Sequence, residues 1–168
     1  MDRINRAHPI VLDTTFILPA FGVEIEIDST ESVQEKIREV RESQETPILI
    51  SDLSPLESFL KAFRLAEKAK SEEGKKAAKT GFLAVTADTS TFRCISHSSP
   101  DIVRAAFEIR MTHNDPFDCF IFATAKVFGA TLVTEDSNAI RYLGVEKVES
   151  WKNFKKTLSS KKGKFGTV

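Results

Sequence analysis

The sequence has few cysteines, no long apolar run and no net charge, and each of these absences excludes a class of protein. Cys94 and Cys119 are its only cysteines and do not have the spacing of a metal-binding motif, so we expect two inert buried thiols. No apolar stretch approaches the roughly 20 residues that span a bilayer. The N-terminal segment MDRINRAHPIVLD also lacks the long apolar stretch of a secretory signal. We therefore expect a cytoplasmic protein that has no membrane partner.

The charge balance limits how the protein could attract a nucleic acid. The sequence has 24 basic and 24 acidic residues, so any such attraction must come from a local patch. The densest basic run could bind phosphates or could equally be a solvated tail; it consists of Lys155, Lys156, Lys161, Lys162 and Lys164. Without an internal repeat or a linker, the chain predicts one domain over residues 1–158, followed by a basic, disordered tail over residues 159–168.

Short apolar runs alternate with helical patterns along the chain, which is typical of an α/β fold. The predicted strands are residues 9–12, 47–51, 92–95, 130–134 and 145–148. The predicted helices are residues 19–21, 30–42, 54–66, 100–111, 117–128, 137–143 and 151–158. Residues 70–79 are charged and contain Gly74, which predicts a loop or a helix end, and residues 80–90 fit either strand or helix. The alternation favours a three-layer α/β/α domain with a central, mainly parallel sheet.

The segment Asn114–Asp136 is the most informative part of the chain. Its residues 117–128 are apolar nearly all the way round, which indicates a buried helix, and Gly129 ends this helix before a short buried strand. Asp115 and Asp118 lie where the helix begins, and Asp136 lies just after the strand. Because helix and strand run in opposite directions, these acids can meet at one edge of the sheet.

Two further acids are expected at the same edge. Asp13 follows the first predicted strand, and Glu57 lies in the first helical turn after the second strand. In a parallel sheet the working crevice lies outside the carboxyl ends of the strands. Each acid could instead be a helix cap; in particular, Ser54-Pro55-Leu56-Glu57 has the pattern of a capping box.

Taken together, the acids favour a metal site over four separate caps. Asp13, Glu57, Asp118 and Asp136 would repel one another, since no compensating lysine or arginine is evident nearby in the sequence. A divalent ion would remove that repulsion. Oxygen ligands without histidine or cysteine favour Mg²⁺ or Mn²⁺ over zinc.

The segments VLDTTFIL, LSPLE and NDPFDCFIFATAKVFGATLVTED together resemble the PIN domain, a family of metal-dependent ribonucleases. The resemblance covers about Pro9 to Trp151. It implies a catalytic, metal-binding quartet of Asp13, Glu57, Asp118 and Asp136, with Asp115 as a further metal ligand and Thr14 and Thr134 in support. Glu135 adds an acid beside Asp136 for which the sequence offers no explanation.

The resemblance also implies an activity: hydrolysis of phosphodiester bonds in single-stranded or structured RNA by water that Mg²⁺ or Mn²⁺ activates. No histidine is required, so His8, His97 and His113 are expected to be bystanders, although His113 is close enough to the site to contact RNA. No nucleophile elbow appears in the sequence, which argues against covalent catalysis.

The biological role remains open at the level of the sequence. The protein could be the toxin of a toxin–antitoxin pair with an antitoxin partner, an RNA-processing or quality-control nuclease, or an RNA-binding module with an inactive site. A receiver-type phosphoryl-transfer protein is disfavoured because it would need a lysine near the site after a late strand, and the sequence offers no convincing candidate. The family commonly forms homodimers. The apolar side chains Phe59, Leu60 and Phe63 on the second long helix are more numerous than one core face requires, so we expect a homodimer through the helices after Ser54.

Overall fold

A five-stranded sheet, in which every pair of neighbouring strands is parallel, forms the centre of the fold. The computed structural model describes residues 8–43 and 46–162. The strand order is β3-β2-β1-β4-β5, and the strands are β1 (Ile10–Leu12), β2 (Ile48–Ser51), β3 (Arg93–Ile95), β4 (Thr131–Val133) and β5 (Val148–Glu149). Val11 of β1 lies opposite Leu49 of β2 and Leu132 of β4. The predicted parallel sheet, with the first, second and fourth strands as neighbours, is therefore confirmed.

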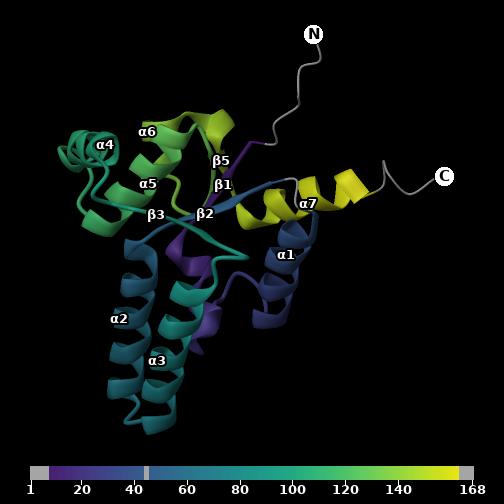
Figure 1. Cartoon of the computed structure of the whole chain (residues 1–168), viewed down its shortest axis with the longest axis vertical. Coiled ribbons are helices and arrows are strands. Elements are labelled where there is room, and N and C mark those ends of the chain that lie inside the picture. The colour runs from purple at the N-terminus through teal and green to yellow at the C-terminus, as the bar shows by residue number, and fades with distance from the viewer. Residues whose placement is uncertain (1–7, 44–45, 163–168) are drawn as a thin grey trace.

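Helices cover both faces of this sheet, because the strand side chains alternate and both faces are apolar. One face packs against α1 (Thr30–Ser43), α2 (Leu53–Lys68), α3 (Glu72–Ala87), α7 (Trp151–Lys162) and the 3₁₀ turns η1 (Thr14–Phe16) and η2 (Leu18–Phe21). The other face packs against α4 (Pro100–Arg110), α5 (Pro116–Phe128) and α6 (Ala139–Leu143). Figure 1 shows α4, α5 and α6 grouped at one side of the sheet and α1 and α7 at the other. The three-layer α/β/α fold is confirmed.

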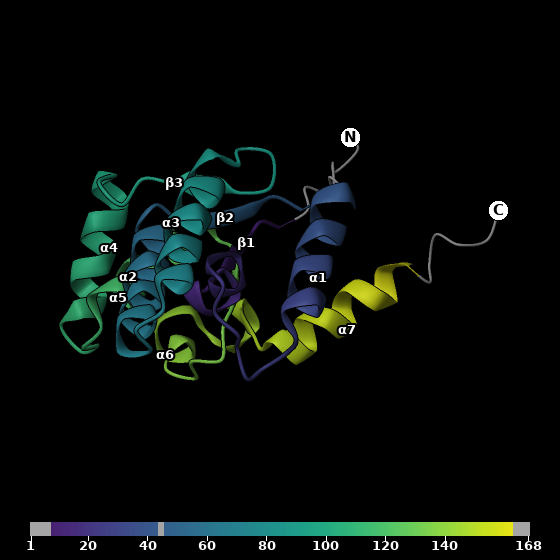
Figure 2. The ribbon, with the colours of Figure 1, turned by 90° about the horizontal axis from the view of Figure 1, so that it is seen from below.

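Helix α3 replaces the loop that the sequence predicts around residues 70–79. It lies beside α2 in Figure 1 and again in Figure 2. Ser71 caps it, since its Oγ accepts a hydrogen bond from the Gly74 backbone N–H at 2.9 Å. A Cβ atom on Gly74 would lie 2.9 Å from the Cβ of Ala66 on α2. Gly74 therefore permits close packing of α3 on α2, and a loop over residues 70–79 is wrong for this tertiary reason. A helix does end nearby, since α2 ends at Lys68 and α3 begins at Glu72.

The same helix covers the aromatic side chains of α2 that suggested a dimer interface. The ring centroid of Phe59 lies 5.7 Å from that of Phe82 on α3 and 5.5 Å from that of Phe63. Phe59 and Phe82 both pack against the core on this face of the sheet. Phe59 is thus partly covered by α3, whereas Leu56 and Leu65 of α2 are exposed, so the homodimer through α2 stays a prediction.

Several boundaries differ from the sequence prediction. Helix α7 continues to Lys162, four residues beyond the predicted end at 158, and the rest of the predicted tail, with Lys164, lies outside the described residues. Residues 145–147 form a 3₁₀ turn, so the last strand is shorter and later than predicted. Cys119 is buried as expected, but Cys94 is exposed, which corrects the expectation of two buried thiols.

The base of α7 is fixed by Trp151, which stacks on Phe16 with ring centroids 4.8 Å apart. The Trp151 backbone N–H donates to Glu135 Oε1 at 2.8 Å, and its indole Nε1–H donates to Asp28 Oδ2 at 2.7 Å. This explains Glu135: its carboxylate satisfies the first N–H of α7. Burial favours the neutral form of Asp28, yet hydrogen bonds from Lys155, Trp151 and other donors hold the pKa of this carboxyl well below its usual range.

None of the helices in the described ranges combines the length and the apolar character needed to cross a bilayer.

Candidate active site

Asp13 and Asp136 are linked through one hydroxyl at the carboxyl edge of the sheet. The Asp13 backbone N–H donates to the Val133 carbonyl at 3.1 Å, which extends the pairing of β1 with β4 one residue past the end of β1. Thr134, which is buried, donates its hydroxyl to Asp13 Oδ2 and accepts the Asp136 backbone N–H at 3.0 Å. Thr134 therefore holds the two acidic segments together.

Glu57 reaches the same edge from the first turns of α2. Its carboxylate is 4% exposed; Oε2 accepts the Thr14 hydroxyl at 2.5 Å, and Oε1 lies 2.5 Å from Lys61 Nζ. The capping-box prediction is wrong, because α2 begins at Leu53 and the Ser54 hydroxyl has no partner in the described part of the chain. Glu57 is thus not needed at the helix terminus and can take part in the site.

Asp118 lies in the first turn of α5, close to His113 and Asp136. His113 Nε2 is 3.2 Å from Asp118 Oδ2. His113, Asp118 and Asp136 each offer one ligand atom, and these atoms all lie within 4.8 Å of one another. His113 was expected to be a bystander, but it contacts a predicted ligand directly.

Asp115 has a structural role that fixes the start of this helix. Its Oδ1 accepts the backbone N–H groups of Phe117 at 2.8 Å and of Asp118 at 3.3 Å. This is an N-cap, as the Asp-Pro pattern predicts. The cap sets the direction of the first turn of α5 and therefore the position of the Asp118 carboxylate.

The electrostatics of Asp118 and Asp13 show that the acids act on one another. Burial raises the pKa of Asp118 to about 6, with repulsion from Asp115, Asp13 and Glu57 in the same direction and the hydrogen bond with His113 opposing it. Burial and the charge of Glu57 also raise the pKa of Asp13, against the hydrogen bond from Thr134. These carboxylates therefore form one electrostatic cluster.

Lys61 is the compensating cation that the sequence analysis did not find. Burial alone would lower its pKa, but the hydrogen bond with Glu57 and the charges of Glu57, Asp13 and Asp118 raise it overall. The expectation that no lysine lies nearby in the sequence is wrong. Lys61 is one helical turn after Glu57, the spacing that brings such side chains together on a helix, so the sequence did carry a signal for it.

The contact of His113 with Asp118 was harder to predict from the sequence than that of Lys61 with Glu57. It lies outside α5, five residues before Asp118, so no helical periodicity connects the two side chains.

The donor atoms of this cluster suit a hard divalent cation. Carboxylate oxygens dominate, as Mg²⁺ and Mn²⁺ prefer. The raised pKa of Asp118 is a measure of the charge crowding that such a cation would relieve.

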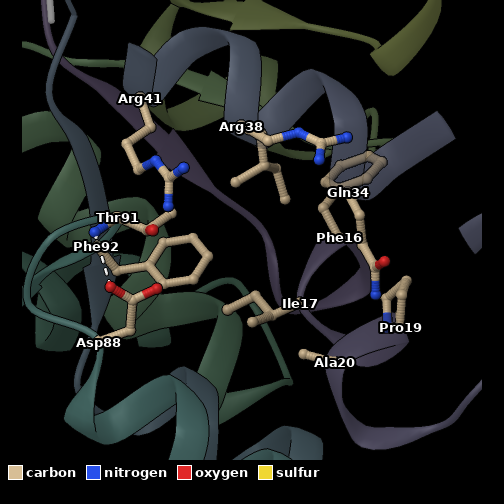
Figure 3. Close-up of a pocket in the computed structure, with 11 residues that line it drawn as sticks. Phe16, Ile17, Pro19, Ala20, Gln34, Arg38, Arg41, Asp88, Thr91 and Phe92 are labelled. Atoms are coloured by element: carbon tan, nitrogen blue, oxygen red, sulfur yellow. Dashed lines mark hydrogen bonds between the residues drawn. The ribbon is translucent and has the colours of Figure 1, made fainter. Parts of the chain in front are cut away.

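A separate cavity of about 200 Å³ lies away from these acids, between α1, the first 3₁₀ turns and the segment that leads into β3. Figure 3 shows Arg38 and Arg41 of α1 above apolar side chains that include Ile17 and Phe92. None of the predicted site residues lines this cavity, so it does not add to the acidic site.

Comparison with known proteins identifies the family to which the chain belongs. The family profile described as PIN domain matches residues 10–144, which include every predicted acid of the site. A search of curated proteins gives no match.

Among solved structures, the chain is similar to VapBC2 from Rickettsia felis, solved bound to a DNA fragment from their promoter, with 18% identity, 84% of this chain and 98% of that chain covered, and a TM-score of 0.59. It is also similar to PAE2754 from Pyrobaculum aerophilum, with 15% identity, 94% of each chain covered and a TM-score of 0.59. A toxin–antitoxin complex from Klebsiella pneumoniae has 18% identity, coverage of 83% and 95%, and a TM-score of 0.49. At these identities the similarity concerns the fold.

PIN domains are generally nucleases. Because the profile covers most of the chain and the fold agrees with it, this protein belongs to the PIN-domain family.

Proposed function

We propose that this protein is a metal-dependent ribonuclease that hydrolyses phosphodiester bonds of single-stranded or structured RNA in the cytoplasm, with Mg²⁺ or Mn²⁺ as its cofactor. The observation that carries the proposal is the crowding of carboxylates at the carboxyl edge of the sheet. Burial and the charges of Asp115, Asp13 and Glu57 raise the pKa of Asp118 to about 6. A fold that only needed helix caps would not bring acids from distant segments close enough to raise one another's pKa.

In this proposal Asp13, Glu57, Asp118 and Asp136 hold the metal and are the catalytic acids, and Asp115 is a further ligand at the exposed rim. When bound, divalent ions supply activation of water and stabilisation of the charge that develops on the departing oxygen.

The remaining groups orient these acids. The Thr134 hydroxyl fixes the rotamer of Asp13, and the Thr14 hydroxyl fixes that of Glu57. Lys61, whose side chain is 49% exposed, brings a positive charge to the rim of the site. An RNA phosphate that approaches the acids would be attracted by this charge.

A more specific proposal is that the protein is the toxin of a toxin–antitoxin pair, with an antitoxin protein as its partner. The fold similarity to VapBC2, which was solved on a fragment of promoter DNA, is the observation that favours this role. Co-expression with the product of a small neighbouring gene would test it: relief of growth arrest supports a toxin, whereas harmless expression of the active enzyme alone supports an RNA-processing or quality-control nuclease.

The nuclease activity is tested on a fluorescent single-stranded RNA with protein stripped of metal by a chelator. Cleavage should appear only after Mg²⁺ or Mn²⁺ is added. Asp118→Asn and Asp13→Asn should each reduce the rate by at least about a hundredfold, because metal-ion catalysis supplies several kcal/mol.

Glu135→Gln is the matched control, since Glu135 adjoins Asp136 in sequence but bonds to α7. It should cleave RNA at the rate of the wild type. Full activity of either Asp→Asn variant, or undiminished cleavage in chelator, contradicts the nuclease proposal. RNA binding without any cleavage would favour an inactive binding module.

A further inference from the structure

We propose that His113 is a nitrogen ligand of the metal, so that the site binds a transition-metal ion such as Mn²⁺ in preference to Mg²⁺. The inference rests on the proposed function, which places a divalent ion among the acids. It adds a ligand of a different chemical type, and it makes a statement about which ion the site selects.

The donor atoms of His113, Asp118 and Asp136 are spaced closely enough to bind one ion. His113 Nε2 lies 3.2 Å from Asp118 Oδ2, and these two groups and Asp136 have their ligand atoms within 4.8 Å of one another. In an octahedral site with bonds of about 2.1 Å, adjacent ligands are about 3.0 Å apart and opposite ligands about 4.2 Å apart. The three donors therefore need only small side-chain adjustments to share one ion.

The His113 ring is held in place by its neighbours. Its side chain is 12% exposed, and its ring centroid lies 5.3 Å from that of Phe122 and 5.7 Å from that of Tyr142. Its backbone is also fixed: the carbonyl accepts Arg110 Nη1 at 2.8 Å, and the N–H donates to the Ile109 carbonyl at 3.0 Å. A ligand fixed before the ion arrives loses little conformational entropy on binding.

His113 could instead be a group that only donates a hydrogen bond and thereby orients Asp118, without binding the ion. That role requires a contact with Asp118 alone. In the structure a ring nitrogen of His113 also lies within 4.8 Å of a carboxylate oxygen of Asp136, an acid that reaches the site from another segment of the fold. His113 is therefore near acids from both α5 and the segment after β4, as a third ligand of an ion that bridges those acids would be.

The choice of ion follows from ligand chemistry. Mg²⁺ strongly prefers oxygen ligands, whereas an imidazole nitrogen increases affinity for first-row transition metals along the series from Mn²⁺ to Co²⁺ and Ni²⁺. One nitrogen among carboxylates therefore leaves Mg²⁺ binding nearly unchanged and strengthens the binding of Mn²⁺ and, more strongly, Co²⁺.

The test measures metal binding by the full chain, independently of cleavage. Pulsed electron paramagnetic resonance of the Mn²⁺-loaded wild type should detect coupling to a directly bound ¹⁴N nucleus. Titration calorimetry with Mn²⁺, Co²⁺ and Mg²⁺ then compares the wild type with His113→Gln, whose amide can still hydrogen-bond to Asp118.

His97→Gln is the matched control, since His97 Nδ1 forms a similar pair with Asp52 Oδ1 at 2.9 Å but does not belong to the three-ligand group. His113→Gln should weaken Mn²⁺ binding by about tenfold or more, Co²⁺ binding by more than that, and Mg²⁺ binding by less than about threefold. His97→Gln should change none of the three.

Coupling to ¹⁴N in the wild type that disappears in His113→Gln, together with the selective loss of Mn²⁺ and Co²⁺ affinity, supports the inference. Tight metal binding without ¹⁴N coupling overturns the inference and leaves the proposed nuclease intact. An equal loss of Mn²⁺ and Mg²⁺ affinity in the variant also overturns it, because that is the pattern of a group that only orients Asp118. If the wild type binds no divalent ion at all, the proposed function fails together with the inference.

Discussion

Replacing Asp118 with Asn should stabilise the metal-free protein, although it should abolish cleavage. Burial and neighbouring acids raise the pKa of Asp118 from 3.8 to about 6, so its ionised form disfavours the folded state at neutral pH. Asn has nearly the same shape and no charge, and its carbonyl oxygen can still accept a hydrogen bond from His113 Nε2, which lies 3.2 Å from the carboxylate in the wild type.

The size of the effect follows from the pKa. A shift of about 2 pKa units corresponds to about 3 kcal/mol at 1.36 kcal/mol per unit. Asn also loses the favourable interaction of a negative charge with the N-terminus of α5, which offsets up to about 1 kcal/mol. The net gain is about 2 kcal/mol in the free energy of unfolding, or about 4–8 °C in Tm for a domain of this size.

The stability difference between Asp118→Asn and the wild type should also depend on pH. Because the folded-state pKa of Asp118 is raised, the stability that its protonated form provides is fully present below the unfolded value of 3.8 and is lost as the pH rises through about 6. In the wild type this loss occurs across that window, and in Asp118→Asn it does not. The variant should therefore exceed the wild type in Tm at pH 8 and not at pH 4.

Differential scanning calorimetry in chelator, at several pH values from 4 to 8, measures this difference. Asp101→Asn is the control, because Asp101 lies in the first turn of α4 after a proline, is largely exposed and has no acidic cluster around it. It should lose stability slightly at pH 8. A lower Tm for Asp118→Asn than for the wild type in chelator at pH 8, or a difference that does not shrink toward pH 4, would refute the electrostatic argument.

Three further outcomes are expected. Glu135→Ala should lower Tm by about 2–4 °C, because it removes about 1 kcal/mol of capping at α7, and should leave the cleavage rate unchanged. Asp136→Ala, by contrast, should abolish cleavage. An inactive Glu135→Ala would contradict this prediction. The pKa of Asp28 is depressed, so the stability that its carboxylate provides is present above pH 3.8 and is lost as the pH falls below that value. Tm of the wild type should therefore fall more steeply between pH 5 and pH 2 than Tm of Asp28→Asn, and equal slopes would contradict this. A homodimer through α2 remains a prediction, and light scattering that gives a monomer at micromolar concentration would contradict it.

The sheet could be predicted from the sequence because its central strands are short apolar runs. β1, β2 and β4 are buried on both faces, so they lack the polar alternation of a surface strand, and only a sheet covered on both sides accommodates such runs. The acids at the strand ends followed from the same logic, since parallel strands bring their carboxyl ends to one edge.

What the sequence did not reveal depends on contacts between distant segments. Helix α3 looks like a loop because Gly74 has a poor helix propensity, and its reason for being there is the close approach of Ala66 on α2. Glu57 fits the capping-box pattern, but its actual partner is Thr14, 43 residues earlier in the chain. Local patterns carry no information about such partners.

The bond between Thr134 and Asp13 joins groups 121 residues apart in the chain, and this separation affects how the enzyme is made. At synthesis rates of about 5–20 residues per second, Asp13 waits roughly 6–24 s for Thr134 to be added. During that interval β1 can pair with β2, but its other edge lacks β4, and the acid cluster lacks Asp118 for most of this time and Asp136 for all of it. A nascent chain therefore has no complete acidic site until nearly the whole domain has been translated, so the proposed ribonuclease would be inactive during most of its own synthesis.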